Sequence, residues 1–353
     1  MSPPSERVLN EYYTNYAPII QSKIVDFLEH GRTIPVRLGS KHIITCTVGI
    51  NPDSTSFVYE FLNDLLDDRN LKNLLLGDIN VLMGIVRKVY LLPDIYLGNL
   101  TKKRLSSMKY QEGDILEDFY TIVKEIFVSD IYENTGVFNK TQFIEDRGLR
   151  ICPYCGISNI EVTKRTDKRV IKPHIDHFLP KSIYPFLALS FYNLIPACPE
   201  CNMEPNKGDR DPLSSDKRLL HLMNPYSFDE GSFIFTYSYN GAGDLDSTNF
   251  KVGIDYLNNI HLEKGYNEIT AVEPIYKKMN KELHALWTQM RNLNNSRLKF
   301  AKVLLPNAEI DDLISNTSVL GYVFEERNSR IYAYYKFNKD LYTLIRKDFT
   351  QND

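Results

Sequence analysis

The sequence predicts an α+β protein, in which a small module held by four cysteines lies between two mostly helical regions with small β elements. Three observations predict this organisation. Helical periodicity dominates residues 1–146; cysteines, prolines and basic residues concentrate in residues 147–225; a strand pattern followed by helical patterns fills residues 226–353. Hydrophobic residues make up 43% and charged residues 25% of the 353-residue chain, as in an ordinary globular protein with a sizeable core.

The N-terminal accessory region is predicted to be mainly helical. A helix is expected over residues 5–30, where Ser5 can cap a long apolar stripe. Residues 33–48 alternate between apolar and polar around a Gly-Ser pair, which is typical of a hairpin. Apolar residues at helical spacing then predict two or three helices over 54–92 and one amphipathic helix over 114–132.

The C-terminal accessory region is predicted to combine strands and helices. Residues 231–243 alternate and end in a Gly-rich turn, which indicates a strand. Residues 273–305 form one long helical pattern. A late strand is expected over 329–337 and a terminal helix over 339–349.

Four of the five cysteines form the pattern C-x2-C-x42-C-x2-C, at Cys152, Cys155, Cys198 and Cys201. Two such pairs suit a tetrahedral zinc ion, because each pair on a tight turn can supply two thiolates to one metal. A site closed by four thiolates is structural rather than catalytic. The alternative is four unrelated buried cysteines, which two matched pairs disfavour. Cys46 is left over and is expected to be a small core hydrophobe.

Charge and cysteine usage narrow the class of protein. The net charge of −3 argues against a highly basic nucleic-acid coat protein, although residues 147–210 contain ten Lys/Arg and six Asp/Glu. An odd cysteine count and an N-terminus without an apolar stretch predict a reducing, cytoplasmic location. No apolar run approaches the ~20 residues that cross a bilayer, so no membrane association is expected.

The stretch "PHIDHFLPKS", residues 173–182, places Asp176 directly before His177 between the two cysteine pairs. A histidine with a pKa near 6.5 is a suitable general base at neutral pH. Adjacent side chains on a strand point to opposite faces, so Asp176 and His177 would have different roles. Asp176 would bind a hard divalent cation and His177 would face water. The alternatives are a satisfied core histidine and a turn-capping aspartate. His174 would share the side of Asp176 and could reach the metal or a phosphate there, but a packed or exposed histidine is favoured.

Residues 164–169, "KRTDKR", have the pattern of a hairpin tip that precedes this stretch. Basic tips can contact phosphates and so add to the salt dependence of nucleic-acid binding. A solvated turn with no partner is the equally weighted alternative.

From Cys152 to Asp209, about a sixth of the chain, the sequence resembles the zinc-knuckle branch of the HNH (ββα-metal) endonuclease superfamily. The resemblance is carried by the Asp176-His177 pair, Pro180, and the block "YNLIPACPECN" that contains Asn193 and Asn202. It implies that Asp176 is a metal ligand and His177 the general base, that Asn193 fixes the loop that positions the histidine, and that a residue on the following helix is the second metal ligand.

The second metal ligand is where the chain departs from the commonest family pattern, which has His where this chain has Asn202. An amide oxygen can still bind a hard cation such as Mg²⁺ or another divalent ion. Asn206 is the alternative ligand if the helix begins at Pro205, because proline is tolerated only in the first turn. Asn202 is favoured. Lys207 would then lie near the phosphate backbone or in solvent.

The resemblance implies a metal-dependent endonuclease that hydrolyses DNA phosphodiester bonds and leaves 5′-phosphate and 3′-hydroxyl ends. A module of this kind in otherwise unassigned sequence resembles the nuclease subunits of bacterial anti-phage systems such as Septu, which act with an ATPase partner. The modest local charge indicates that a partner or self-association contributes to the grip on DNA. Two alternatives stay open: an RNA-cleaving effector on the same module, and a non-catalytic zinc-stabilised binding module.

Overall fold

The computed structural model describes residues 4–38, 42–48, 57–90, 115–116, 119–164, 166, 170–240, 246–292 and 334–351. Within these residues the protein mixes helices with small, separate sheets, which confirms the predicted α+β class. None of the described helices combines the length and the apolar character that crossing a membrane requires.

The N-terminal stretch confirms the predicted first helix, the hairpin and the three helices that follow. Ser5 caps the first helix by accepting a hydrogen bond from the Val8 amide, and Gly31 ends it with a φ of 61°. The described elements are α1 (Glu6–His30), β1 (Arg32–Leu38), β2 (His42–Val48), α2 (Phe57–Asp64), α3 (Asp68–Leu76), α4 (Ile79–Tyr90), β3 (Ile115–Leu116), α7 (Phe119–Val123), the π-helix η1 (Lys124–Tyr132) and α8 (Lys140–Arg147).

The predicted helix over 114–132 is only partly correct. Ile115 and Leu116 pair in parallel with Thr47 and Val48 of β2, so the helix begins at Phe119. These two residues belong to a strand because the neighbouring hairpin offers them backbone partners, which no local pattern reveals.

The middle of the chain holds two short antiparallel strand pairs. The predicted hairpin around residues 164–169 is confirmed by the pairing of its two flanking strands, although residues 165 and 167–169 of its tip lie outside the described residues. The described strands and helix are β4 (Thr163–Lys164), β5 (Val170–Ile171), β6 (His174–His177), β7 (Leu194–Ala197) and α9 (Pro199–Asn202). Two antiparallel strands followed by a short helix therefore carry the Asp-His pair and the second cysteine pair.

The C-terminal stretch confirms the strand predicted over 231–243 and the terminal helix predicted over 339–349. Its described elements are β8 (Ile234–Tyr239), β9 (Phe250–Asp255), α10 (Ile260–Ile269), α11 (Val272–Tyr276), α12 (Asn280–Asn292) and α15 (Tyr335–Gln351). β9 was not predicted, and it pairs antiparallel with β8.

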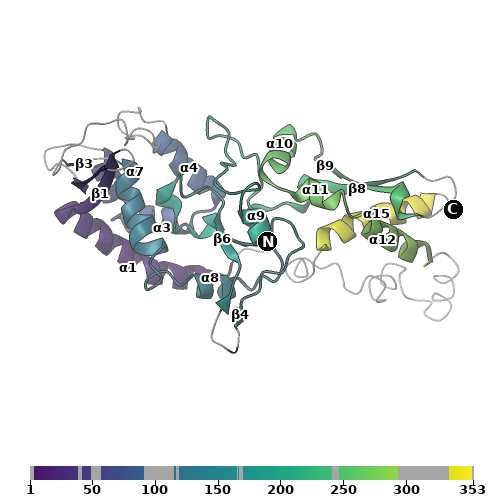
Figure 1. The fold of residues 1–353 in the computed structure, drawn as a ribbon, viewed down its shortest axis with the longest axis horizontal. Coiled ribbons are helices and arrows are strands. Elements are labelled where there is room, and N and C mark those ends of the chain that lie inside the picture. Colours follow the sequence, from purple (N-terminus) through teal and green to yellow (C-terminus); the bar gives the residue numbers. More distant parts are fainter. Residues whose placement is uncertain are drawn as a thin grey trace.

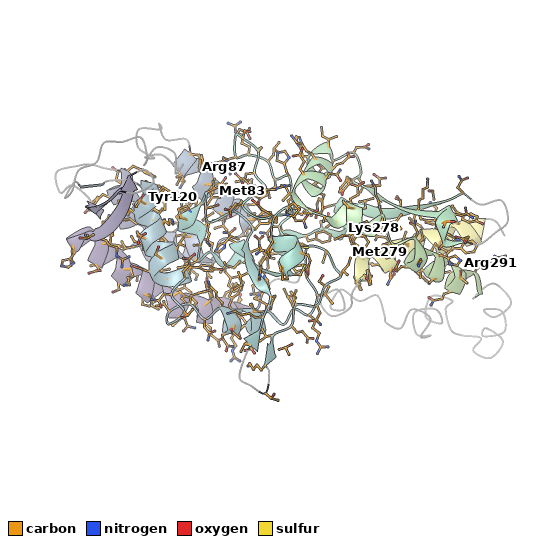
Figure 2. All side chains as sticks on the ribbon, in the orientation of Figure 1. Met83, Arg87, Tyr120, Lys278, Met279 and Arg291 are labelled. Atoms are coloured by element: carbon orange, nitrogen blue, oxygen red, sulfur yellow. The ribbon has the colours of Figure 1, made fainter. Side chains whose placement is uncertain are left out.

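Two C-terminal predictions are wrong in part. The long helix predicted over 273–305 is interrupted after Tyr276. The next helix, α12, begins at Asn280, and the Met279 carbonyl before it accepts a hydrogen bond from the Leu283 amide. Lys278 and Met279 mark this break in Figure 2. Residues 293–305 lie outside the described residues.

The late strand predicted over 329–337 is not found where it can be checked, because residues from Tyr335 onward are helical. Residues 329–333 lie outside the described residues. Phe337, Leu341 and Ile345 are fully buried at a spacing of four residues, so one helical stripe faces the core. The aromatic run had the composition of a strand, but this helical periodicity decides the structure.

Buried apolar side chains form one continuous cluster from α1 to α15, to which the loop after β6 also contributes. That loop is held by the N-terminal helices: the Tyr12 hydroxyl donates to the Leu189 carbonyl (2.8 Å), and the Ser190 hydroxyl donates to the Leu74 carbonyl (2.6 Å). Met83 of α4 belongs to this core, whereas Arg87, one turn later, is only partly buried (Figure 2). The boundaries predicted at 146/147 and 225/226 stay predictions.

The described elements form an elongated molecule (Figure 1). Helices α1, α3 and α7 lie toward one end, and β8, α12 and α15 lie toward the other. Strand β6 and helix α9 lie between these two ends, so the Asp-His pair and the cysteines occupy the middle of the molecule (Figure 1).

Candidate functional site

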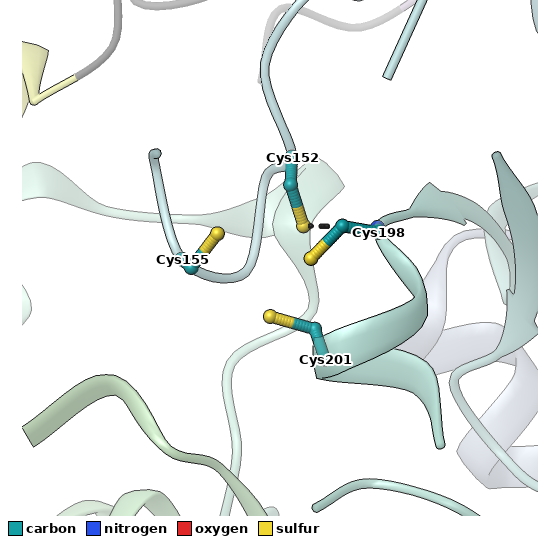
Figure 3. Close-up of side chains that lie close together, drawn as sticks. All are labelled: Cys152, Cys155, Cys198 and Cys201. Atoms are coloured by element: carbon teal, nitrogen blue, oxygen red, sulfur yellow. Dashed lines mark hydrogen bonds between the residues drawn. The ribbon is translucent and has the colours of Figure 1, made fainter. Parts of the chain in front are cut away.

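The four paired cysteines converge in the middle of the chain. Their sulfur atoms all lie within 4.8 Å of one another, all four side chains are buried, and none is in a disulfide (Figure 3). Four sulfurs placed about 2.3 Å from one ion in a tetrahedron would be about 3.8 Å apart. The cluster could therefore bind a zinc ion with little rearrangement, which supports the prediction made from the C-x-x-C spacing.

Local backbone structure explains why the cysteines meet. Gly156 has a φ of 67° and its amide donates to the Cys152 carbonyl (2.8 Å), which closes the first turn. The Cys198 amide donates to the Cys152 sulfur (3.4 Å), which joins the two turns. Hydrogen bonds among the thiols, with Cys152 first, raise the pKa of Cys201 and lower that of Cys155. Four thiolates this close together need a cation to offset their repulsion.

Strand β6 positions Asp176 and His177, and both side chains are buried, with 3% and 6% of their surface exposed. The His177 Nε2 lies 3.1 Å from the Ala188 carbonyl oxygen. Because a carbonyl can only accept, Nε2 carries the proton and Nδ1 is left as the basic nitrogen of the ring. Burial, together with the positive charge of Lys181, lowers the pKa of His177 to about 3. The imidazole is therefore neutral near pH 7.

Two residues restrict the movement of His177: Tyr132 by direct contact and Asn193 through a loop. The Tyr132 ring packs edge-on against the imidazole, with 4.5 Å between ring centroids. The fully buried Asn193 side chain accepts from the Leu179 amide (2.7 Å) and donates to the carbonyls of Leu179 (3.0 Å) and Leu187 (3.1 Å). Asn193 thus ties together both ends of the loop that carries the Ala188 carbonyl.

A cavity of about 190 Å³ lies beside β6. Asp176, His177 and Asn202 all form part of its wall. The wall as a whole consists of Ile175, Asp176, His177, Pro180, Lys181, Asn202, Gly208 and Asp209. Asn193 does not line the cavity and acts through the loop. Asn206 is also absent from the wall, because its amide nitrogen donates to the Glu200 carbonyl (2.6 Å). The structure therefore brings Asn202, and not Asn206, next to Asp176.

His174 contacts Asn202. The Asn202 amide nitrogen lies 3.2 Å from His174 Nδ1, and the contact is a hydrogen bond when that nitrogen is unprotonated. This bond orients the Asn202 amide and leaves its oxygen to accept from other groups. His174 is partly buried, and its contact with Asn202 orients a residue of the cavity wall.

Sequence reasoning missed the roles of Lys207 and Tyr154. Lys207 is only 1% exposed, so its predicted placement in solvent is wrong. Its ammonium lies 3.5 Å from Asp176 Oδ1 and donates to the His177 carbonyl (3.1 Å). Tyr154, inside the first C-x-x-C turn, donates a short hydrogen bond to Asp176 Oδ2. The only sequence signal for the burial of Lys207 was the glycine that follows it. Gly208 has a φ of 44°, which lets the chain turn back.

The oxygen atoms of Asp176 and Asn202 could bind a divalent cation, but the positive charge of Lys207 opposes its binding. Asp176 and Asn202 offer a carboxylate and an amide oxygen in one cavity, and both are ligands that Mg²⁺ accepts. Each Asp176 oxygen already has one partner, but a carboxylate can accept about four bonds. Burial raises the pKa of Asp176, although Lys207 and Tyr154 favour its charged form. The Lys207 charge would weaken the binding of a divalent ion to this carboxylate.

Replacing Lys207 with methionine is expected to lower the free energy of unfolding by about 3–5 kcal/mol, because Asp176 would lose its buried partner. Urea unfolding of the purified protein measures this. The double variant Lys207→Met with Asp176→Asn removes both charges, so it should regain most of the loss. A single variant as stable as the wild type would show that the pair does not stabilise the fold.

No protein-family profile, curated protein or solved structure matches this chain. The chemistry of the site therefore has to be argued from its own atoms. These are a neutral, oriented imidazole, two oxygen ligands in the same cavity, and a four-thiol cluster joined to that cavity through Tyr154.

Proposed function

We propose that this chain is a metal-dependent endonuclease of the HNH (ββα-metal) type that hydrolyses DNA phosphodiester bonds. The observation that carries the proposal is the His177 arrangement: its Nε2 proton is held by the Ala188 carbonyl, and the ring shares a cavity with Asp176 and Asn202. Hydrolysis needs a base that is unprotonated and fixed in orientation, and His177 has both properties.

In this proposal the Nδ1 atom of His177 takes a proton from the attacking water, while the Ala188 carbonyl and the Tyr132 ring keep the imidazole from rotating. Asp176 and Asn202 would hold the divalent cation, which supplies positive charge for the phosphoryl oxygens and the leaving oxygen. Asn193 acts through the loop that carries Ala188. By resemblance, the products would carry 5′-phosphate and 3′-hydroxyl ends.

A second candidate function is a non-catalytic zinc-stabilised binding module. The observation that favours it is the buried Lys207–Asp176 pair, which already gives the carboxylate a cation. Against it stands the tautomer set by Ala188, because a scaffold needs no basic nitrogen beside a cavity. RNA cleavage stays a variant of the first proposal, since a site that acts on a phosphodiester does not by itself read the base. A role in anti-phage defence with an ATPase partner is proposed from the resemblance alone.

The proposal is tested by incubating the purified, zinc-loaded protein with supercoiled plasmid and with structured RNA, in Mg²⁺ or Mn²⁺. We expect nicked or linear DNA in the presence of either ion and none after brief addition of EDTA. Zinc content measured on the same samples separates loss of the catalytic cation from loss of structural zinc. Cleavage of RNA but not DNA would change the substrate. Cleavage of neither, with intact zinc, would favour the binding module.

A further inference from the structure

Two lysines from separate segments lie at or beside the His177 cavity, and a third lies in the segment that leads into β6. Lys181, in the loop after β6, forms part of the cavity wall. Lys140 begins α8, and its ammonium lies 4.2 Å from the centroid of the Tyr132 ring that packs against His177. Lys172 is exposed and precedes β6 by two residues. We call Lys140, Lys172 and Lys181 the lysine rim.

The members of the lysine rim lie within electrostatic range of one another. Burial lowers the pKa of Lys140, Glu133 opposes this, and the charges of Lys181 and Lys172 lower it further. Glu133 is an exposed carboxylate 3.3 Å from the Lys181 ammonium, and it offsets one of the three positive charges. Like charges held together repel, so an anion that binds among them would be stabilised.

Two other basic groups in this part of the described structure are already engaged. Lys207 is buried against Asp176, and Lys164 of β4 is paired with Glu145 at 2.7 Å. Among the residues that the structure describes, the positive charges that remain accessible near the cavity are therefore those of the lysine rim, opposed in the cavity wall by the exposed Asp209. Because the three lysines come from three segments, they suit an anion that presents several charges along a chain.

We propose that Lys140, Lys172 and Lys181 bind backbone phosphates of the nucleic acid that flank the bond attacked at His177. This assignment rests on the proposed function for the position of the scissile bond, but it concerns binding rather than hydrolysis. Phosphates of a nucleic-acid backbone follow one another along the strand, so three separate ammoniums can each contact a different one.

The test measures binding without cleavage. Fluorescence anisotropy gives the Kd of a labelled DNA duplex, and of an RNA duplex of the same sequence, in buffers without divalent ions over 50–200 mM salt. We expect each of Lys140→Gln, Lys172→Gln and Lys181→Gln to reduce the slope of log Kd against log salt on duplex DNA by about 0.9, and the triple variant by about 2.7. Lys264→Gln, an exposed lysine of α10, is the matched control and should leave the slope unchanged.

The variant Glu133→Gln should strengthen DNA binding, whereas the lysine variants should weaken it. Removing this carboxylate frees Lys181, so DNA should bind more tightly at low salt, which a merely damaged fold would not produce. A triple variant with the wild-type slope, or a wild type that binds neither duplex, overturns the assignment. Cleavage that persists with an unchanged slope contradicts the lysine rim alone. A reduced slope without any metal-dependent cleavage supports the rim and contradicts the nuclease.

Discussion

Replacing His177 with alanine should reduce the rate of metal-dependent cleavage by about 10²- to 10⁴-fold, the usual contribution of a general base. The reason lies in the geometry of the ring. The Ala188 carbonyl fixes the proton on Nε2, so Nδ1 is the basic nitrogen of a ring that belongs to the cavity wall. Alanine has no group that can take the proton from water. Initial rates of plasmid nicking in saturating Mn²⁺ measure the effect.

Loss of folding has to be separated from loss of the base, because His177 is buried and contacts Tyr132. His177→Gln places an amide nitrogen near the position of Nε2, so it can still donate to Ala188 but has no basic nitrogen, and it should fold and remain inactive. His261→Ala, at an exposed position, is the matched control and should keep full activity. Unfolding temperature and duplex binding are compared for all three variants. Wild-type rates in both His177 variants would remove this residue from the mechanism.

The local patterns around the site could be read from the sequence. The C-x-x-C spacing predicts a cluster of four thiols, and the four cysteines do converge. Strand alternation predicts that Asp176 and His177 point to different faces, whereas both form part of the same cavity wall. The position of Asn202 directly after the last cysteine put it on α9, which ends beside β6. These predictions depend on residues close together in sequence or on a spacing fixed by one metal, so they need no knowledge of the whole fold.

The parts that could not be predicted depend on contacts between distant segments. Lys207 is buried because residues 203–208 turn back over Asp176, and no periodic pattern marks such a turn. Tyr154 reaches Asp176 only because the two cysteine pairs meet. Ile115 and Leu116 became a strand because β2 was beside them. Tertiary contacts outweigh local preference at each of these positions.

The largest expected effect on the fold is that of removing one zinc-site thiol. Cys198→Ser should lose the bound zinc and several kcal/mol of folding free energy, because structural zinc sites have apparent binding energies of about 10–16 kcal/mol. The Cys198 amide also joins the two turns through the Cys152 sulfur, so both turns should loosen together. Zinc content by mass spectrometry and thermal unfolding measure the two effects. Cys46→Ser, the fifth cysteine, is the matched control and should retain zinc.

The same substitution also tests how the cysteine cluster supports the cavity. Tyr154 lies between Cys152 and Cys155, and its hydroxyl donates to Asp176, so the first turn positions the carboxylate as well as the thiols. Without zinc, Asp176 should lose this partner and the divalent cation should bind more weakly. Tyr154→Phe removes the hydroxyl alone and should keep the zinc while weakening Mn²⁺ binding, measured by calorimetry. If Cys198→Ser keeps its zinc and its stability, the cluster is not a structural metal site. If Tyr154→Phe leaves Mn²⁺ affinity unchanged, the two sites are independent, because the hydroxyl is the direct side-chain contact between the first cysteine turn and Asp176.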